Sequence, residues 1–302
     1  MLNIVSCKRT EAEIFLTHPK VKGITFVGTT KAGKHIYSVA AAHGKRVQAL
    51  CEAKNHALVM YDAPIERTAA GIINAAYGCA GERCMALPVV VAHEKIADKL
   101  VEELLKQAKL IKVGPAYDKT SKLGPVVNPQ HKERIEGYIA KGVEEGATLV
   151  LDGRNHVVEG FEKGFYLGPT IFDHVTEDMV IGKEEIFGPV LCVKRVKSFE
   201  EGLEIMNNNP FANGSVIFTQ SGYYAREFAR NTDGGMVGVN VGIPVPVGFF
   251  SFTGHKDSFF GDLHCLGKDA FRFFTEQKTV TTKWFTQEES TQTEVSTWDG
   301  TI

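Results

Sequence analysis

Short apolar runs alternate with longer amphipathic segments along almost the whole chain. The runs that read as strands are residues 21–27, 46–50, 57–61, 88–92, 148–151, 165–172, 190–196, 215–218 and 236–241. The segments that read as helices are residues 31–43, 64–81, 93–110, 130–145, 199–207 and 223–231. Strands and helices that alternate at this spacing predict an α/β fold with a largely parallel sheet.

A few stretches depart from this alternation. Residues 113–129 form a connection rich in glycine and proline, and residues 242–250 (GIPVPVGFF) form a loop lined by apolar side chains. Residues 279–285 read as a last strand. Residues 286–302 are rich in Ser, Thr and Glu, and we expect them to be disordered.

Length and charge exclude several classes of protein. The 302 residues are enough for a large core and two lobes, and the net charge of −2 gives no reason to expect nucleic acid or a membrane surface as partner. No apolar run is long enough to span a bilayer, and no signal peptide is visible. Residues 2–15 carry Glu11 and Glu13, so they are also a poor transit peptide.

Six cysteines are scattered without the spacing of metal ligands or of a disulfide framework. This favours free thiols in a reducing compartment and predicts no metal site. Cys84 follows a run of small residues in the string CAGERCMA, where nothing bulky shields its thiol. It is either an accessible nucleophile or a buried structural cysteine, and the local string leaves both interpretations open.

A glycine turn at residues 28–34 (GTTKAGK) has the spacing of a phosphate-binding P-loop between a strand and a helix. A P-loop then needs Ser or Thr as a magnesium ligand, and this chain has His35, so a nucleoside triphosphatase is a poor third alternative. The turn is either a plain strand–helix connection or a helix N-terminus where Gly28 and Thr29 hold the phosphates of a dinucleotide.

Taken together, four strings resemble the aldehyde dehydrogenase superfamily: FVGTTKAG from Phe26, GERC ending at Cys84, EEIFGPV from Glu184, and Val239-Asn240. Further strings are similar to its coenzyme A-acylating branch, the methylmalonate-semialdehyde dehydrogenases: AKNH from Ala53, CMAL from Cys84, NNNP, VGIPVPVGFFSFTG, GDLH and KTVTTKW. The resemblance covers residues 2–284.

The resemblance implies a role for each matching residue. Cys84 is the nucleophile that attacks the aldehyde carbon, and the adduct passes hydride to NAD and leaves a thioester. Glu185 holds the nicotinamide ribose, Phe187 lies beside the ring, and Thr29 with Gly28 contacts the pyrophosphate. Glu184 and Glu185 could otherwise be a solvated acidic pair.

The implied substrate is malonate or methylmalonate semialdehyde, which is converted with coenzyme A to acetyl-CoA or propanoyl-CoA and CO₂. In the family this reaction belongs to valine and pyrimidine catabolism, or to inositol catabolism in bacteria. Arg83 either binds the substrate carboxylate or pairs with Glu82.

The chain departs from the family pattern at two nearby positions. Hydrolytic relatives carry a general-base Glu where this chain has Leu50, which favours transfer to a thiol rather than to water. The acylating branch usually has Gly where this chain has Glu52, and a carboxylate there is unexpected close to the cofactor. The family also has about a further domain before the equivalent of Leu2, with the first strands of the dinucleotide fold and the oxyanion-hole Asn.

These observations give one domain assignment. Residues 1–51 are expected to be the end of a Rossmann-type NAD-binding domain, 52–278 an α/β catalytic domain, 279–285 an oligomerisation strand and 286–302 the tail. We expect a homo-oligomer, dimer or tetramer, in mitochondria if the source is eukaryotic and otherwise in the cytoplasm. The alternative function is a catalytically silent, shortened paralogue that binds intact subunits.

Overall fold

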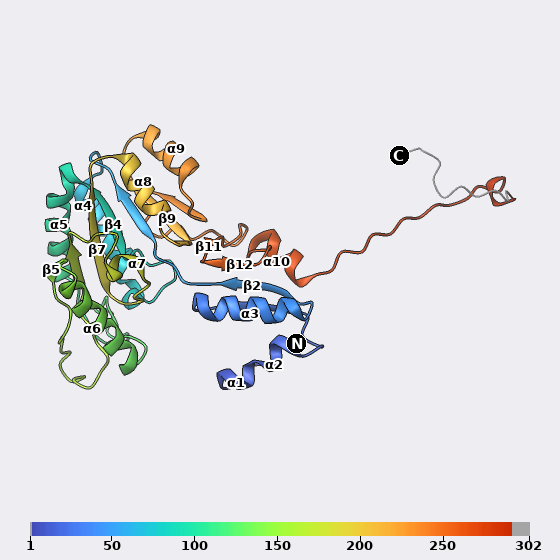
Figure 1. Cartoon of the computed structure of the whole chain (residues 1–302), viewed down its shortest axis with the longest axis horizontal. Coiled ribbons are helices and arrows are strands. Elements are labelled where there is room, and N and C mark those ends of the chain that lie inside the picture. The colour runs from blue at the N-terminus through green and yellow to red at the C-terminus, as the bar shows by residue number, and fades with distance from the viewer. Residues whose placement is uncertain (1, 292–302) are drawn as a thin grey trace.

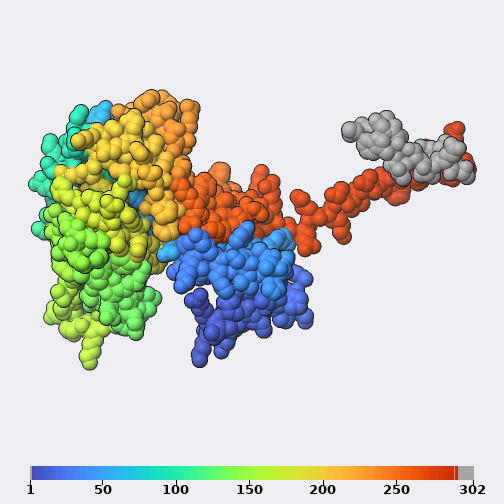
Figure 2. Space-filling model, viewed as in Figure 1, coloured from blue at the N-terminus to red at the C-terminus, as the bar shows by residue number. Residues whose placement is uncertain are grey.

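The computed structural model describes residues 2–291 of the chain. Figure 1 shows a large α/β body, a smaller lobe beside it, and a C-terminal segment that runs away from both. The small lobe combines the N-terminal segment, in blue, with a C-terminal stretch, in red. The space-filling view shows an indentation between the blue lobe and the green part of the body (Figure 2).

A seven-stranded sheet forms the centre of the large body. Its order is β10-β9-β3-β4-β7-β6-β5, and all neighbours run parallel except β5 and β6. The strands are β3 (His56–Val59), β4 (Val89–His93), β5 (Thr148–Leu151), β6 (Thr170–Asp173), β7 (Val190–Val196), β9 (Gly214–Phe218) and β10 (Met236–Val239). Its parallel strands therefore share one amino-terminal edge.

Helices cover both faces of this sheet, which is why its central strands are almost continuously apolar. On one face lie α4 (Ile65–Tyr77) and α5 (Glu94–Lys109); on the other lie α6 (Pro129–Glu144), α7 (Val180–Lys183), α8 (Phe199–Asn207) and α9 (Gly222–Asn231). Strand residues alternate between the two cores: Ala57 and Val59 pack toward α4 and α5, and Leu58 packs toward the opposite helices.

The small lobe has its own sheet, in the order β1-β2-β12. Strands β1 (Gly23–Val27) and β2 (Arg46–Leu50) are parallel and are joined by helix α3 (Thr30–Ala42). The third strand, β12 (Phe259–Phe260), is antiparallel to β2 and comes from the far end of the chain. The lobe also holds α1 (Arg9–Ala12), α2 (Ile14–Thr17) and α10 (Gly267–Phe274). Strands β8 (Phe211–Ala212) and β11 (His255–Lys256) pair antiparallel as a separate two-stranded sheet.

Most predicted elements are present. Strands 46–50, 148–151 and 190–196 and helix 199–207 have the predicted bounds, and most of the others differ by one or two residues at an end. Helix 64–81 divides into α4 and a 3₁₀ turn, Gly78–Gly81, and Pro64 stands before the first helical residue rather than at it. The short elements β8, β11, β12, α1, α2, α7 and α10 were not predicted.

The prediction of a strand over residues 165–172 is wrong for most of its length, because only Thr170–Asp173 joins the sheet. Before it, the backbone of Gly168 donates to the carbonyl of Gly153 at 2.8 Å. A Cβ atom on Gly153 would lie 2.0 Å from the Gly168 carbonyl oxygen. This loop-to-loop contact takes the place of a strand ladder. The predicted strand 236–241 also ends early, at Val239, because Asn240 has a φ of +58°.

Residues 279–285 pair with no strand in the described part of the chain, and every residue from 275 to 288 is exposed. An oligomerisation strand would pair with another subunit, so that role stays a prediction. The predicted tail begins with exposed residues and a short 3₁₀ turn, Glu289–Thr291, and its remainder, 292–302, lies outside the described residues. Within residues 2–291, no helix is both long and apolar enough to cross a membrane.

Candidate active site

The candidate site lies between the small lobe and the large body. Asn55, Cys84, Glu185 and Asn213 stand in the turns that precede β3, β4, β7 and β9. Because these strands are parallel neighbours, their turns meet at the amino-terminal edge of the large sheet. The carboxyl ends of β1 and β2 in the small sheet lead into this same region.

The bend that presents Cys84 depends on small residues, as the sequence predicted. Cys79, Ala80 and Gly81 have φ angles of 52°, 55° and 72°. A Cβ atom on Gly81 would lie 2.1 Å from the carbonyl oxygen of Gly188, so this position has no room for a side chain. The bend leaves Cys84 partly exposed, whereas Cys51 and Cys192 are buried.

Two buried amides hold the Cys84 turn. Nδ2 of Asn55 donates to the carbonyl oxygens of Cys84 and Ala86 at 2.9 and 2.7 Å, and its Oδ1 accepts from the Gly214 amide at 2.8 Å. Nδ2 of Asn213 also donates to the Cys84 carbonyl, at 3.1 Å. Buried backbone groups left unpaired are costly, so these bonds fix the turn in one position.

The loop that carries Glu185 and Phe187 is held by helix α6. Arg134 donates to the carbonyl oxygens of Glu185 and Ile186 at 3.1 and 3.3 Å. The ring of His131 contacts the carbonyl oxygen of Phe187 at 2.6 Å. Phe187 has a φ of 59° and remains 36% exposed, so its ring is presented to the cleft rather than packed into a core.

Glu185 is a partly buried carboxylate. Its Oε1 accepts from the backbone amide of Ala53 at 3.1 Å. Burial, with a smaller contribution from the negative charge of Glu52, raises the pKa of Glu185 to about 7, against the lowering effect of the Ala53 hydrogen bond. A solvated acidic pair is therefore not what the structure contains.

An arginine next to a cysteine in the chain would favour its thiolate, but Arg83 does not do this for Cys84. Burial raises the pKa of Cys84, and the charge of Glu185 raises it further. Arg83 turns away: its Nε donates to the carbonyl of Gly78 at 3.1 Å, and a Cβ on Gly78 would lie 1.4 Å from Nη2 of Arg83. Burial and the charge of Glu185 thus both favour the protonated thiol in this conformation.

The structure also lacks the alternative ion pair between Arg83 and Glu82. Glu82 accepts from the Val127 amide at 3.1 Å and lies 3.3 Å from Nε2 of His131. Within residues 2–291, the Nη atoms of Arg83 make no hydrogen bond or ion pair. The guanidinium is therefore available to another anion.

The N-terminus of α3 carries the glycine turn. Thr29 is its N-cap, and its Oγ1 accepts from the Ala32 amide at 3.4 Å. The backbone amide of Thr30 donates to Oε2 of Glu52 at 2.8 Å. Lys34, which a P-loop would direct at phosphate, pairs with Asp257 at 3.0 Å instead.

One cleft of about 420 Å³ joins these parts. It brings together five of the six residues predicted for the site, and Arg83 is not part of its lining. The lining residues are Val27, Gly28, Thr29, Cys51, Glu52, Cys84, His131, Arg134, Glu185 and Phe187. The sequence patterns missed Asn55, Asn213, Arg134 and His131 as supporting residues, because their partners are backbone carbonyls far away in the chain.

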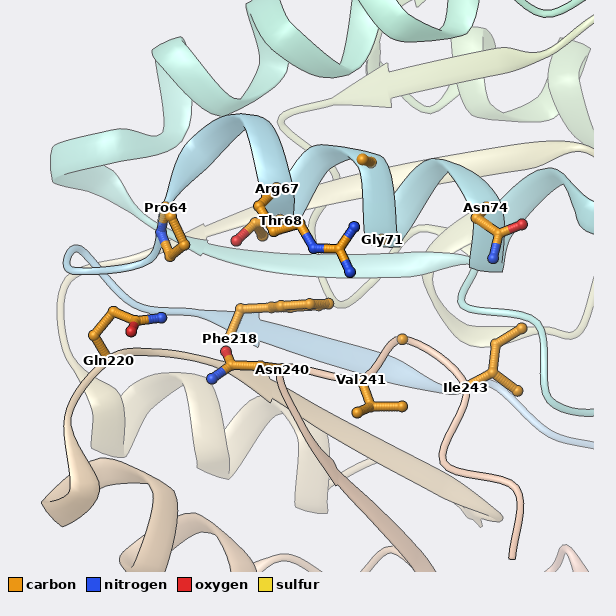
Figure 3. Close-up of a pocket in the computed structure, with 12 residues that line it drawn as sticks. Pro64, Arg67, Thr68, Gly71, Asn74, Phe218, Gln220, Asn240, Val241 and Ile243 are labelled. Carbon is orange, nitrogen blue, oxygen red and sulfur yellow. The ribbon is translucent and has the colours of Figure 1, made fainter. Parts of the chain in front are cut away.

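A larger cleft of about 620 Å³ lies between α4 and the chain that follows β9 and β10 (Figure 3). Arg67 and Asn74 reach into it from α4, and Asn240 faces them from the other side. The amide of Asn240 bonds to the backbone N and O of Thr219 at 3.0 and 2.9 Å, which gives it a structural role. Neither Cys84 nor Glu185 lines this second cleft. Separately, the described residues contain no group of three or more His, Cys, Asp or Glu that could hold a metal ion.

Comparison with known proteins shows which family the chain matches. The aldehyde dehydrogenase family matches residues 1–280. A malonate-semialdehyde dehydrogenase of Oceanobacillus iheyensis is 50% identical over 285 residues, which are 94% of this chain and 58% of that protein. A second one, from Geobacillus thermodenitrificans, has the same identity and coverage.

Solved structures are similar along the same stretch. A methylmalonate-semialdehyde dehydrogenase from Oceanimonas doudoroffii is 44% identical with a TM-score of 0.91, over 93% of this chain and 58% of that one. An aldehyde dehydrogenase of Mycobacterium tuberculosis complexed with NAD⁺ is 28% identical with a TM-score of 0.82, over 87% and 53%. The predicted α/β fold and family resemblance are confirmed, and the chain spans about 58% of the length of the curated relatives it matches.

Proposed function

The chain belongs to the aldehyde dehydrogenase family, and from this premise we propose that Cys84 forms a covalent adduct with an aldehyde and then carries the acyl group as a thioester. The observation that supports this most directly is the single cleft that joins the Cys84 thiol, the Glu185 carboxylate and the N-terminus of α3. A nucleophile, an ionisable group and anion-binding amides in one cleft are the parts that such a reaction needs. A nucleoside triphosphatase has no support, since Lys34 is paired with Asp257.

The proposed substrate is malonate or methylmalonate semialdehyde. Two relatives named malonate-semialdehyde dehydrogenase are 50% identical to the matched part of the chain, and one named methylmalonate-semialdehyde dehydrogenase is 44% identical. Their substrates carry a carboxylate, and the Nη atoms of Arg83 make no hydrogen bond or ion pair within residues 2–291. Arg83 would bind this carboxylate after a change of rotamer, because its side chain now lies against Gly78.

The proposed cofactor is NAD, which accepts a hydride when it is bound. At its nicotinamide end the cleft fits: Glu185 offers a carboxylate for the ribose hydroxyls, and Phe187 presents a half-exposed ring. At the other end, Gly28 and Thr29 lie at the N-terminus of α3, but the Glu52 carboxylate takes the Thr30 amide. The diphosphate end is therefore not open in this conformation.

Cys84 must lose its proton before it can attack. Burial and the charge of Glu185 both oppose this, because they raise the thiol pKa. When a proton neutralises Glu185, part of that opposition is removed. Glu185 with a pKa of about 7 changes its charge close to physiological pH, so it would tune the Cys84 thiol from within the same cleft.

Coenzyme A is the proposed acyl acceptor. Leu50 ends β2 two residues before Glu52 and supplies no carboxylate to activate a water. Attack by the coenzyme A thiol on the Cys84 thioester returns the cysteine and releases acyl-CoA. The malonate-type carboxylate leaves as CO₂ when its bond to the α-carbon breaks, and that carbon takes up a proton to give the acetyl or propanoyl product.

The test is NADH formation by the 302-residue chain with malonate semialdehyde, NAD⁺ and coenzyme A, beside Cys84→Ser as the control. We expect the chain alone to turn over poorly, and the turnover that it has to depend on both Cys84 and coenzyme A. Turnover that continues without coenzyme A contradicts the acceptor, and turnover in Cys84→Ser contradicts the nucleophile. Leu50→Glu should raise the hydrolysis of the thioester relative to its transfer to coenzyme A.

The second candidate is a non-catalytic role in which the chain docks onto intact subunits. It is favoured by the extended, exposed segment from 275 to 288, where Val280, Trp284 and Phe285 are 76%, 88% and 63% exposed. Exposed apolar groups on an unpaired extended segment are suited to strand addition. Co-purification with a full-length relative, lost when Trp284 and Phe285 are replaced by Ser, tests it; a chain that never associates excludes it.

A further inference from the structure

Glu52 is placed where the cleft should receive an anion. Its side chain lines the cleft with Gly28 and Thr29, and its Oε2 accepts from the Thr30 amide at 2.8 Å. The first amides of a helix have no partner within the helix, and together they carry a partial positive charge of about half a unit. A carboxylate bound there neutralises that charge from inside the protein.

The backbone of Glu52 is fixed by a turn from the C-terminal part of the chain. Ser258 donates its hydroxyl to the Glu52 carbonyl at 2.6 Å and accepts from the Ala212 amide at 3.1 Å. The Ser258 carbonyl also accepts from the Cys51 amide at 2.8 Å. The carboxylate is thus presented from a rigid backbone, and only its own side-chain torsions need to change to move it.

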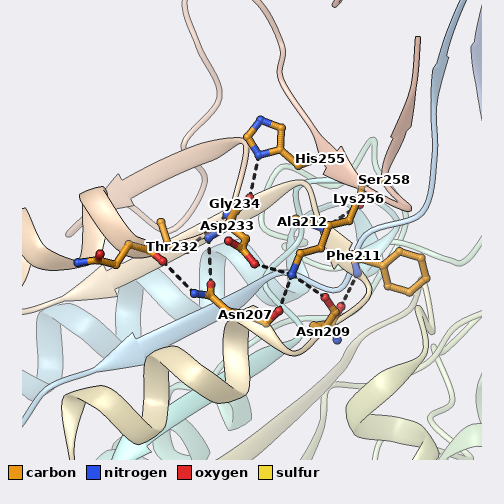
Figure 4. Close-up of polar contacts among 11 residues, drawn as sticks. Asn207, Asn209, Phe211, Ala212, Thr232, Asp233, Gly234, His255, Lys256 and Ser258 are labelled. Carbon is orange, nitrogen blue, oxygen red and sulfur yellow. Dashed lines mark hydrogen bonds and ion pairs between the residues drawn. The ribbon is translucent and has the colours of Figure 1, made fainter. Parts of the chain in front are cut away.

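The turn itself is anchored by Lys256, as Figure 4 shows. Its Nζ pairs with Asp233 Oδ2 at 2.6 Å and donates to the carbonyl oxygens of Asn207 and Asn209. Lys256 has a φ of 52°, which these contacts hold in place. The antiparallel pair β8–β11 therefore positions Glu52 from a distance, through Ser258.

The charged groups around Glu52 disfavour the binding of a phosphate. The cleft also contains Glu185, and Asp257 stands next to Ser258 and pairs with Lys34 at 3.0 Å. Arg134, the arginine of the lining, is engaged with two carbonyl oxygens. A diphosphate that approaches α3 thus meets a carboxylate in the place of free amides, and no unengaged cation in the cleft lining compensates for it.

We propose that Glu52 is a built-in competitor for the diphosphate of the nicotinamide cofactor: it occupies the N-terminus of α3 and must swing away before a dinucleotide can bind. This inference rests on the proposed function for the identity of the ligand. The site itself is defined by the Thr30 amide and the Glu52 carboxylate. Glu52 thereby sets the affinity of the chain for the cofactor.

The experiment compares the full 302-residue chain with Glu52→Gly and Glu52→Gln by calorimetry, with inorganic pyrophosphate and NAD⁺ as separate probes. We expect both probes to bind Glu52→Gly about tenfold more tightly, which is about 1.4 kcal/mol. Glu52→Gln, which keeps the hydrogen bond and loses the charge, should be intermediate. Thermal melting without ligand checks that each variant is folded. If Glu52→Gly does not fold, the wild-type chain is compared with Glu52→Gln alone.

Asp257→Asn is the matched control, since it removes a neighbouring charge without freeing the Thr30 amide. An equal gain in Asp257→Asn and Glu52→Gly overturns the inference, because net charge alone would then explain it. Equal affinities in the wild-type chain and both Glu52 variants, or no binding in any of them, also overturn it. A gain for pyrophosphate without any NAD⁺ binding supports the competitor role and counts against the proposed function.

Discussion

Replacing Glu185 by Gln should change how the stability of the chain depends on pH. In the unfolded chain this carboxyl loses its proton near its ordinary pKa of 4.5, and in the folded chain burial raises the pKa to about 7. Between these values the folded state binds more protons than the unfolded state, so the free energy of unfolding falls as the pH rises. The penalty is absent below the lower pKa and complete above the higher one.

The two pKa values set the size of the effect. A rise from 4.5 to about 7 corresponds to roughly 3 kcal/mol as an upper limit. Because Glu185 keeps some contact with solvent, we expect about 2 kcal/mol. Glu185→Gln removes the charge and can still accept from the Ala53 amide, so at about pH 8 it should be more stable than the wild-type chain by that amount, with no gain at about pH 4.

Urea denaturation at several pH values measures this difference directly. The second readout is alkylation of Cys84 by iodoacetamide at about pH 8, which should be faster in Glu185→Gln because ionised Glu185 raises the thiol pKa. Glu184→Gln is the matched control: this exposed neighbour accepts from Tyr138 at 2.6 Å and should leave both the pH slope and the alkylation rate unchanged. An identical pH slope in the wild-type chain and Glu185→Gln would refute the burial argument.

The remaining predictions concern three other positions. Gly33→Ala should cost about 1–3 kcal/mol by urea denaturation, since its Cβ would lie 2.2 Å from the sulfur of Cys51, and Cys51→Ala should restore part of the loss; an unchanged midpoint contradicts this contact. Tyr77→Phe should cost about 1–3 kcal/mol in the same assay, because the buried carbonyl of Thr170 loses its 2.9 Å donor; a neutral effect would mean that another donor replaces it. Arg83→Lys should raise the KM for a carboxylate-bearing aldehyde about tenfold and leave the KM for propanal unchanged, and equal changes for both would exclude carboxylate binding.

Local patterns were enough to predict most of the large sheet. Buried strands such as β4 and β7 each begin with four consecutive apolar residues, and α5 shows its buried stripe at helical spacing. The short strand β12 has no such signal. It becomes a strand because Phe259 and Phe260 pair with Leu50 and Ala49, which lie more than two hundred residues earlier in the chain.

The candidate site could also be predicted from the sequence only in part. Cys84 and Glu185 stand in strings that indicate their chemistry, and the structure places both in one cleft. Their electrostatics could not be predicted locally, since the adjacent Arg83 turns to Gly78 while the distant Glu185 raises the Cys84 pKa. The bond from the Thr30 amide to Glu52 likewise depends on how two turns meet in space.

Acyl exchange with labelled propanoyl-CoA tests, without NAD, whether Cys84 carries the acyl group. The thiolate of Cys84 attacks the thioester carbon, coenzyme A leaves as its thiol, and the label stays on the protein. We expect peptide mapping to find the label on Cys84, with none on the buried Cys51 and none in a Cys84→Ala variant. A chain that takes up no label, or a Cys84→Ala variant labelled as fully as the wild-type chain, would contradict the account.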